Sequence, residues 1–233
     1  MPAATVAGVQ AIILAGGRGE RLLPFTAEHP KCLVEVAGQP VALRQLSWLA
    51  TQGVDEAIFS CGYRWQAIRD RLGDGAGLGL RVRYAPEDEP LGRGGGLRHA
   101  MGLLDASGTF LVINGDVLAQ PALAGFLARH RASQALATVL VVPCVSDDAI
   151  VVSDAEGRVT AFREKPRLPY WINGGLYLME PAIRDLLPER GDHETTTLPA
   201  LAAAGRLSSF AHEGSWFSID SHADIKAAER ALS

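Results

Sequence analysis

The stretch QAIILAGGRGERL, residues 10–22, joins a short apolar run to a loop of glycines and arginines. The apolar run over residues 10–15 predicts a buried strand, and Gly16-Gly17 directly after it predicts a tight loop. Ligands of parallel α/β sheets bind outside the carboxyl ends of the strands. The stretch therefore predicts both a sheet of this kind and a binding loop at its edge.

The glycine loop is suited to a polyanion. Its glycines let the backbone approach a ligand, and Arg18 and Arg21 add forked donors, while Lys31 follows ten residues later. A Walker loop is excluded because no Gly-Lys-Ser/Thr follows, and a dinucleotide fingerprint is excluded because Leu22 stands where a third glycine or alanine is needed. The cations favour a nucleoside triphosphate. The competing interpretation is a plain strand-to-helix turn with solvated arginines.

Strands and helices alternate along the first 145 residues, which predicts a parallel sheet with helices on both faces. In this part we expect strands over residues 56–61, 81–84, 110–113 and 137–142, and helices over residues 41–52, 64–72 and 121–131, with a glycine loop and then a helix in 91–104. In the second part we expect a hairpin of residues 150–152 and 159–163, strands over 171–179 and 207–211, and helices over 196–204 and 222–231.

Length and composition favour one globular domain over residues 1–233, with a change of character at about residue 145. The net charge of −4 and the lack of a basic tail give no reason to expect nucleic acid. No apolar run is long enough for a membrane span, so no membrane partner is expected. The three cysteines, odd in number and far apart, suggest neither zinc nor a disulfide framework, and a reducing cytoplasm is the simplest setting.

Two carboxylates are expected at strand ends. Asn114-Gly115-Asp116 directly follows a buried apolar run, and Asp220 ends a predicted strand over residues 216–220. A carboxylate in such a place, with a glycine removing steric bulk, is a common way to hold Mg²⁺ against phosphates. Taken alone, each aspartate could equally belong to a turn or a helix cap.

Two further segments carry groups for the rest of a ligand. EDEPLGRGGG, residues 87–96, combines a rigid proline with glycines, which suits backbone recognition of a flat base. Glu164-Lys165-Pro166 and, further on, Asn173-Gly174-Gly175 offer a cation for phosphate and polar groups for hydroxyls. Surface loops remain the alternative interpretation of each segment.

Together and in this order, the segments resemble the sugar-1-phosphate nucleotidyltransferase family, from residue 10 to about residue 231. The combination of GGRGERL with PKCLVEVAGQP carries most of this resemblance. It implies an α/β fold with a Rossmann-like, mostly parallel mixed sheet and helices on both faces. It also implies a nucleotide-binding half over about residues 8–145 and a sugar-phosphate half over about 146–233. Mg²⁺ is the implied cofactor, a nucleoside triphosphate and a sugar 1-phosphate are the implied substrates, and family habit suggests a homodimer.

The resemblance also implies residue roles. The nucleotide is expected to contact Leu14, Ala15, Gly16, Gly17, Arg18, Gly19, Arg21, Lys31, Glu87, Pro90, Leu91, Gly94, Gly95, Asn114 and Gly115. The metal is expected on Asp116 and Asp220, and the sugar phosphate on Glu164, Lys165, Asn173 and Gly174. The expected catalytic set is Arg21, Lys31, Asp116 and Lys165.

Within the family, the short chain and EPLGRGGGL are similar to bacterial D-glycero-α-D-manno-heptose 1-phosphate guanylyltransferases. GTP with a heptose or a related cyclitol phosphate is therefore the favoured substrate pair. The alternatives are a mannose-1-phosphate guanylyltransferase and a uridylyltransferase for N-acetylmuramate 1-phosphate. A catalytically silent subunit that senses nucleotide sugars is a further alternative, and a dinucleotide-dependent oxidoreductase is the least favoured.

Three features depart from the family pattern. Glu20 and Arg93 each stand where the family usually has threonine, which places a carboxylate in the phosphate loop and a cation beside the base. Glu20 is expected to pair with Arg18 or Arg21, or to point away. Arg93 would add a phosphate or base contact, and residues 142–150 lack the Arg-Tyr-Gly segment common in the family.

Overall fold

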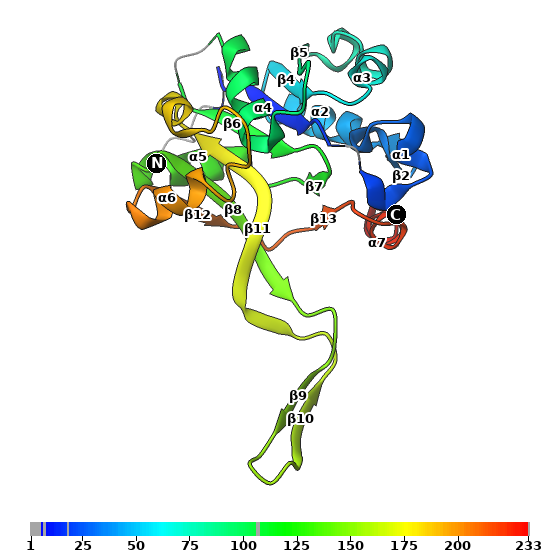
Figure 1. The fold of residues 1–233 in the computed structure, drawn as a ribbon, viewed down its shortest axis with the longest axis vertical. Coiled ribbons are helices and arrows are strands. Elements are labelled where there is room, and N and C mark those ends of the chain that lie inside the picture. The colour runs from blue at the N-terminus through cyan, green and yellow to red at the C-terminus, as the bar shows by residue number, and fades with distance from the viewer. Residues whose placement is uncertain (1–5, 7, 18, 106–107, 233) are drawn as a thin grey trace.

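The centre of the molecule is a seven-stranded sheet, shown in Figure 1. The computed structural model describes residue 6 and residues 8–17, 19–105 and 108–232. Across the sheet the strands are β12 (Leu207–Ala211), β8 (Ala137–Val145), β11 (Arg167–Met179), β6 (Phe110–Asn114), β1 (Ala11–Ala15), β4 (Glu56–Cys61) and β5 (Arg81–Pro86). The expected α/β fold with a mostly parallel mixed sheet is confirmed, because only β11 runs antiparallel to its neighbours β6 and β8.

The chain order reverses at β1. This strand pairs in parallel with β4 on one side and with β6 on the other. Ala15 lies opposite Cys61, and Leu14 lies opposite Asn114, so the loops that follow β1 and β6 emerge side by side. Such a reversal opens a crevice at the carboxyl ends of the strands, where ligands of open α/β sheets bind. The glycine loop and Asp116 both start at this crevice.

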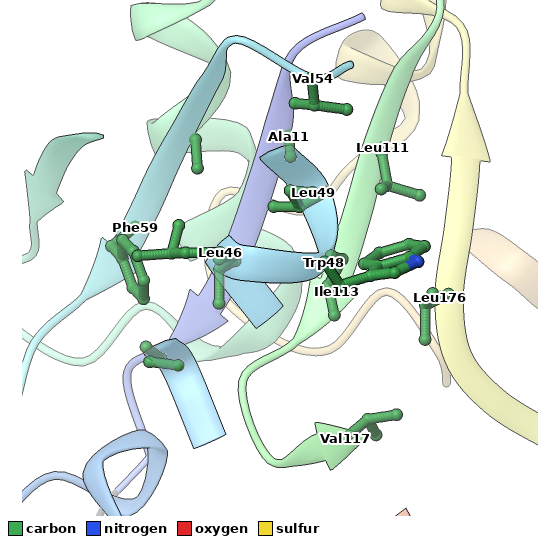
Figure 2. Close-up of a cluster of buried hydrophobic side chains, with 14 of the residues drawn as sticks. Ala11, Leu46, Trp48, Leu49, Val54, Phe59, Leu111, Ile113, Val117 and Leu176 are labelled. Carbon is green, nitrogen blue, oxygen red and sulfur yellow. The ribbon is translucent and has the colours of Figure 1, made fainter. Parts of the chain in front are cut away.

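Helices cover both faces of the sheet because successive side chains of β1 point to opposite sides. Ile13 belongs to the cluster under α2 (Val41–Thr51), α3 (Trp65–Leu72) and α5 (Leu123–Ser133). Ile12 belongs to the cluster under α4 (Gly92–Ala100) and α6 (Thr197–Ala203). Figure 2 shows part of the first cluster, in which Leu46, Trp48 and Leu49 of α2 pack onto the strands. Each fully buried leucine stabilises the fold by about 1.5–3 kcal/mol.

Each predicted helix begins and ends within two residues of the observed one, except in the segment 91–104. There a glycine loop was expected before the helix, but α4 already begins at Gly92. Gly94 and Gly95 both lie in this helix. Position 95 requires glycine, because a Cβ there would come 2.4 Å from the Glu189 carbonyl oxygen. A glycine in a helix is less favourable than an alanine by about 1 kcal/mol. Close packing against the chain around residue 189 therefore outweighs the weak helix propensity of these glycines.

A small two-stranded sheet brings the second half of the chain to the crevice. β7 (Val117–Ala119) pairs antiparallel with β13 (Trp216–Ser218), with Ser218 opposite Val117. The Ile219 amide then donates to the Asp116 carbonyl at 2.9 Å. This pairing delivers Asp220 to the place where Asp116 lies, as expected from a strand over residues 216–220.

The remaining elements are short or peripheral. They are α1 (Phe25–Glu28), α7 (His222–Leu232), the paired strands β2 (Glu35–Val36) and β3 (Gln39–Pro40), and the 3₁₀ turns η1 (Glu20–Leu22), η2 (Lys31–Leu33), η3 (Ala76–Leu78), η4 (Met101–Leu103) and η5 (Pro181–Leu186). None of the helices in the described part of the chain has the length and apolarity needed to cross a membrane.

A long ribbon leaves the body of the molecule, as Figure 1 shows. The predicted hairpin is present as β9 (Ile150–Ser153) and β10 (Val159–Arg163), which pair only with each other in a two-stranded sheet. The two strands that lead to the hairpin are longer than predicted. β8 ends at Val145 rather than at residue 142, and β11 begins at Arg167 rather than at residue 171. We call residues 143–172 the arm.

Candidate active site

The crevice at the ends of β1 and β6 contains two adjoining hollows, of about 800 and about 250 Å³. They share six lining residues and are therefore parts of one cleft; the shared residues are Gly16, Gly17, Lys31, Glu87, Pro90 and Asp116. The larger hollow also contacts Gly19, Glu20, Arg21 and Asp220, and the smaller one contacts Leu14, Ala15, Asn114 and Gly115. Pockets for small molecules commonly have about 300–1,000 Å³, so the cleft can hold a nucleotide.

Lys31 forms the centre of this cleft. Its Nζ lies 2.5 Å from Asp116 Oδ2 and 2.5 Å from Asp220 Oδ1. Arg21 also donates to Asp220 Oδ1, at 2.6 Å, although the Arg21 side chain is largely exposed. Residues from the start, middle and end of the chain thus converge on one point, and four of the residues expected at the site from the sequence lie together.

The protonation of Asp220 follows from these contacts. Burial raises the pKa of its carboxyl, but hydrogen bonds from Lys31 and Ser218 and the charges of Lys31 and Arg21 outweigh burial, so that the net pKa is below the ordinary value. Asp220 is therefore an anion at neutral pH. A carboxylate in this state can hold a cation, which a protonated carboxyl does poorly.

Gly19, in the glycine loop, occupies a place that requires glycine. Gly19 adopts a positive φ of 66°, and a Cβ there would lie 3.0 Å from carbons of Lys31 and Thr26. The Thr26 hydroxyl donates to the Gly19 carbonyl at 2.7 Å and so fixes the end of the loop. Arg18 lies outside the described residues. Glu20 is exposed and forms no ion pair with any other described residue, since Arg21 pairs with Asp220 instead.

Gly115 is needed for a different reason. A Cβ at this position would lie 2.7 Å from the backbone oxygen of Leu14, which accepts the Gly115 amide hydrogen bond at 2.9 Å. The lack of a side chain therefore lets the turn after β6 lie against β1. This contact sets the position of the next residue, Asp116.

We expect the Gly115→Ala variant to unfold with a free energy lower by about 1–3 kcal/mol, because the methyl group forces β1 and the turn apart. Turnover should fall as well, because Asp116 moves with the turn. Denaturant titration and steady-state kinetics measure the two effects. Gly102→Ala is the matched control, since a Cβ at Gly102 meets nothing within 4 Å; equal stability of the two variants would contradict the close-contact argument.

Glu87 follows β5 and lines both hollows. Its Oε2 accepts the backbone N–H of Leu91 at 2.9 Å, and its Oε1 accepts the Ser60 hydroxyl at 3.3 Å. Gly96 provides room for this side chain, because a Cβ there would lie 2.3 Å from Glu87 Oε1. The carboxylate is thus held in place from two sides while it faces the cleft.

Arg93 lines the smaller hollow and is paired there with two carboxylates. It donates through Nε and NH2 to Asp192, and its NH1 lies 2.9 Å from Glu194 Oε1. Glu194 in turn accepts the Tyr177 hydroxyl at 2.7 Å. Burial and the nearby Glu194 raise the pKa of Tyr177, which keeps its hydroxyl protonated as the donor. The contact of Arg93 with phosphate or base stays a prediction.

The same network reaches Asn173, one of the residues expected at the sugar phosphate. Asn173 Nδ2 donates to the Tyr177 hydroxyl at 2.6 Å, and its Oδ1 accepts from the Gly175 amide at 2.9 Å. Gly174 packs against the core, because a Cβ there would lie 2.4 Å from the Leu140 side chain. Neither residue lines the two hollows; Asn173 is exposed and Gly174 is buried.

Five other expected site residues lie away from the hollows. The amides of Gly94 and Gly95 donate to the Gly191 carbonyl, at 2.8 and 3.4 Å, and Leu91 lines neither hollow. The side chains of Glu164 and Lys165 are exposed on the arm and make no hydrogen bond or ion pair within the described part of the chain. The cleft of one chain therefore contains most of the residues expected at the nucleotide but none of those expected at the sugar phosphate.

Gln45 is a site residue that the sequence analysis missed. It is buried in α2, and its Nε2 donates to the carbonyls of Asn114 and Val117 at 2.9 and 2.7 Å. These two hydrogen bonds fix both ends of the turn that carries Asp116. The available signal was a polar residue within the apolar face of a predicted helix. The hydrogen bonds and ion pair by which Tyr177 and Glu194 connect Asn173 to Arg93 were not predicted either, because no local pattern indicated them.

Comparisons with known proteins show the family to which this chain belongs. The sequence pattern of the family described as nucleotidyl transferase matches residues 10–233. A mannose-1-phosphate guanylyltransferase of Mycobacterium tuberculosis is 37% identical over 203 residues, which is 84% of this chain and 56% of that protein. Mannose-1-phosphate guanylyltransferase 1 of Arabidopsis thaliana is 35% identical over 91% of this chain and 61% of its own length. The chain thus spans less than two thirds of these relatives.

Among solved structures, HddC from Yersinia pseudotuberculosis is similar over 97% of this chain and 100% of its own, with 27% identity and a TM-score of 0.77. The complex of HddC with GMP-PN gives 26% identity and a TM-score of 0.76. The fold, the cleft at the switch point and the match over nearly the whole sequence lead to one conclusion. This chain belongs to the nucleotidyl transferase family.

Proposed function

We propose that this protein is a guanylyltransferase, which joins the GMP part of GTP to a sugar 1-phosphate and releases pyrophosphate. The observation that carries the proposal is the position of Lys31 Nζ between Asp116 and Asp220, beside the glycine loop. One cation and two carboxylates at a switch-point crevice are the groups that a triphosphate and a divalent ion require. The names of the sequence relatives and the GMP-PN complex of HddC support a guanine nucleotide.

Asp116 and Asp220 fit a magnesium ion. Their oxygens converge on a single cationic point in this structure, and Asp220 is anionic at neutral pH. Mg²⁺ is typically bound through one or two carboxylates, with the remaining ligands supplied by substrate phosphates and water. When bound, the ion would supply positive charge to the phosphate at which substitution takes place.

The reaction needs little acid–base machinery. The second pKa of a phosphate monoester is about 6, so the sugar phosphate already carries the attacking oxygen as an anion at neutral pH. That oxygen forms a bond to the α-phosphorus of GTP, and the bond from this phosphorus to the bridging oxygen breaks. The electron pair leaves with pyrophosphate. Positioning and charge neutralisation are then the main tasks of the protein.

In our proposal these tasks are divided among the residues expected at the site. Arg21 neutralises the β- and γ-phosphates that leave, assisted by Arg18. Lys31 holds the α-phosphate, and Lys165 holds the incoming sugar phosphate in line with it. Glu164 and Asn173 accept or donate hydrogen bonds to the sugar hydroxyls. The backbone of the glycine loop, which lines the larger hollow, faces the triphosphate.

Glu87 is the proposed reader of the base. Guanine presents two neighbouring donors, N1–H and the N2 amino group, and a carboxylate can accept both at once. Uracil presents one N–H between two carbonyl oxygens, which would face the negative charge of Glu87. The fixed carboxylate beside the smaller hollow therefore favours GTP over UTP.

A heptose or related cyclitol phosphate is the favoured acceptor from the sequence, and mannose 1-phosphate follows from the names of the sequence relatives. The purified protein should be incubated with Mg²⁺, GTP or UTP, and the 1-phosphates of D-glycero-α-D-manno-heptose, mannose, glucose or N-acetylmuramate. Pyrophosphate release is the measurement. We expect release with GTP and one of the first two acceptors.

The other outcomes are decisive as well. Release only with UTP and N-acetylmuramate 1-phosphate would keep the reaction class and contradict the proposed role of Glu87. Binding of GTP without release from any acceptor, including a cyclitol phosphate, would favour the catalytically silent, nucleotide-sensing alternative.

A further inference from the structure

The arm is an unusual feature of a single chain. It consists of residues 143–172, which form the outer parts of β8 and β11 and the β9–β10 hairpin, and it projects from the body (Figure 1). An isolated two-stranded hairpin is at best marginally stable in water. A ribbon of this length therefore needs a surface to pack against.

The side chains of the arm point to the same need. Of the large apolar residues exposed in the described chain, most lie on it; they are Val145, Ile150, Val151, Val152, Val159, Phe162, Tyr170, Trp171 and Ile172. Phe162 and Tyr170 are 68% and 69% exposed. Apolar side chains that gather on one segment, rather than lying singly over the surface, mark an interaction site.

The arm also carries positive charge, of which the cleft has little. The side chains of Arg163 and Lys165 are exposed and form no hydrogen bond or ion pair with the described residues. The larger hollow is lined by five carboxylates (Glu20, Glu87, Asp88, Asp116 and Asp220) but by only two described cations, Arg21 and Lys31, both already bound to carboxylates. A cleft that receives two phosphate-bearing substrates needs further cations.

The strands hold the arm away from the cleft of its own chain. β8 and β11 stay paired from the body into the arm, with Ile172 opposite Val142, Trp171 opposite Pro143 and Arg167 opposite Val145. To reach the cleft of its own chain, this paired ribbon would have to bend back sharply from the direction in which it leaves the body. A second copy can approach the arm without such a bend.

We propose that two copies of this chain exchange arms, so that each places Arg163, Glu164 and Lys165 at the sugar-phosphate side of the other's cleft. This inference rests on the proposed function, which assigns Glu164 and Lys165 to the sugar phosphate. A two-fold axis makes the exchange reciprocal, since each copy gives one arm and receives one. The exposed apolar residues of the arm then become part of the contact between the copies.

A mixed dimer tests the exchange directly. One copy carries Asp116→Asn, the other carries Lys165→Gln, and each has a different affinity tag, so that dimers with one copy of each can be purified. With exchanged arms, one of the two sites combines an intact cleft with an intact arm, and we expect about half of the wild-type turnover. With arms acting within one chain, every site is damaged and turnover should stay at the level of the two parent dimers.

A second variant tests the contact independently of catalysis. Phe162→Glu places a charge on the arm, and Leu186→Glu is the control, because Leu186 is exposed but lies off the arm. By light scattering we expect the wild type and Leu186→Glu to be dimers and Phe162→Glu to be a monomer. The monomer should still bind GTP, because the nucleotide cleft lies within one chain, but it should make little nucleotide sugar.

The outcomes separate the two proposals. A wild-type monomer with full turnover, or a Phe162→Glu monomer with full turnover, would overturn the arm exchange and leave the guanylyltransferase standing. A dimer that Phe162→Glu dissociates but that forms no nucleotide sugar from any tested pair would overturn the proposed function and leave the contact. Full turnover of a Lys165→Gln dimer would remove the proposed role of Lys165 and, with it, the exchange.

Discussion

Replacing Asp116 by asparagine is expected to lower kcat about a thousandfold, the size of effect seen when one preorganised electrostatic group is removed from a reaction centre. Asparagine keeps the shape of the Asp116 side chain but loses the charge that holds the cation and Lys31. In the structure, Asp116 Oδ2 lies 2.5 Å from Lys31 Nζ, so the substitution also leaves that ammonium with Asp220 as its remaining carboxylate partner.

The turn that carries Asp116 should survive this change. Its backbone is fixed by Gln45, by the Gly115–Leu14 hydrogen bond and by the Ile219 amide on the Asp116 carbonyl, none of which uses the Asp116 side chain. We therefore expect unfolding of the variant at nearly the wild-type denaturant concentration. A loss of turnover without a loss of stability would assign the effect to the chemistry.

Initial rates of pyrophosphate release over a range of Mg²⁺ and GTP concentrations measure the effect. Asp185→Asn is the matched control, because Asp185 is exposed and lies outside both hollows. A metal role predicts that higher Mg²⁺ restores part of the rate of the Asp116 variant. Turnover close to that of the wild type at low Mg²⁺ would show that Asp116 is not needed to hold the ion.

The part of the site that the sequence predicted well follows buried strands. Residues 10–15 and 110–113 are short apolar runs that end in glycine or a polar residue, so both the strand and the place of its loop follow from local pattern. Because parallel strands of one sheet end at the same edge, Gly16 and Asp116 could be expected together before any contact was known. Asp220 was expected at a strand end, and the β7–β13 pairing explains how it arrives there.

The part that the sequence did not predict depends on contacts between distant segments. The glycines at 94 and 95 suggested a loop for the base, but they allow α4 to pack against residues 188–193, a contact that no local pattern contains. The path from Arg93 through Glu194 and Tyr177 to Asn173 likewise joins segments that are far apart in the sequence. Ion pairs of this kind depend on the completed fold.

The arm shows a different limit of sequence reasoning. Its strands have the residue types of ordinary strands, so the hairpin at 150–163 was predicted correctly. Apolar residues on an exposed ribbon have the same pattern as apolar residues in a core, however, and the pattern does not say what they face. Glu164 and Lys165 were predicted at the sugar phosphate, and in the structure they lie on the arm and line neither hollow.

Replacing Glu87 by glutamine is expected to lower kcat/KM for GTP about a hundredfold and to reduce the preference for GTP over UTP by at least that factor. A site built to pair with polar groups of a substrate rejects a mismatched partner by a factor of about 10⁴–10⁵. In the variant, the amide N–H of glutamine would face one of the two guanine donors, so that one of the two proposed hydrogen bonds is lost. The introduced amide would suit uracil, which offers one donor beside an acceptor, so the rate with UTP should not fall.

The substitution should leave the fold unchanged, because the carbonyl oxygen of the new side chain can still accept the Leu91 amide that Glu87 Oε2 now accepts. Glu89→Gln is the matched control: Glu89 is exposed, outside both hollows and paired with Arg190 on the surface. Measuring kcat/KM with GTP, ITP and UTP separates the two donors of guanine, since ITP lacks the N2 amino group.

The ranking of GTP, ITP and UTP by kcat/KM also indicates how GTP lies in the cleft. If Glu87→Gln and Glu89→Gln both kept the wild-type order, the base would be read elsewhere in the cleft. Glu87 follows β5, whereas the glycine loop follows β1, and β4 separates these two strands in the sheet. A changed order with Glu87→Gln alone would therefore place the base of GTP toward β5 and its phosphates toward β1, beside Lys31 and the two aspartates.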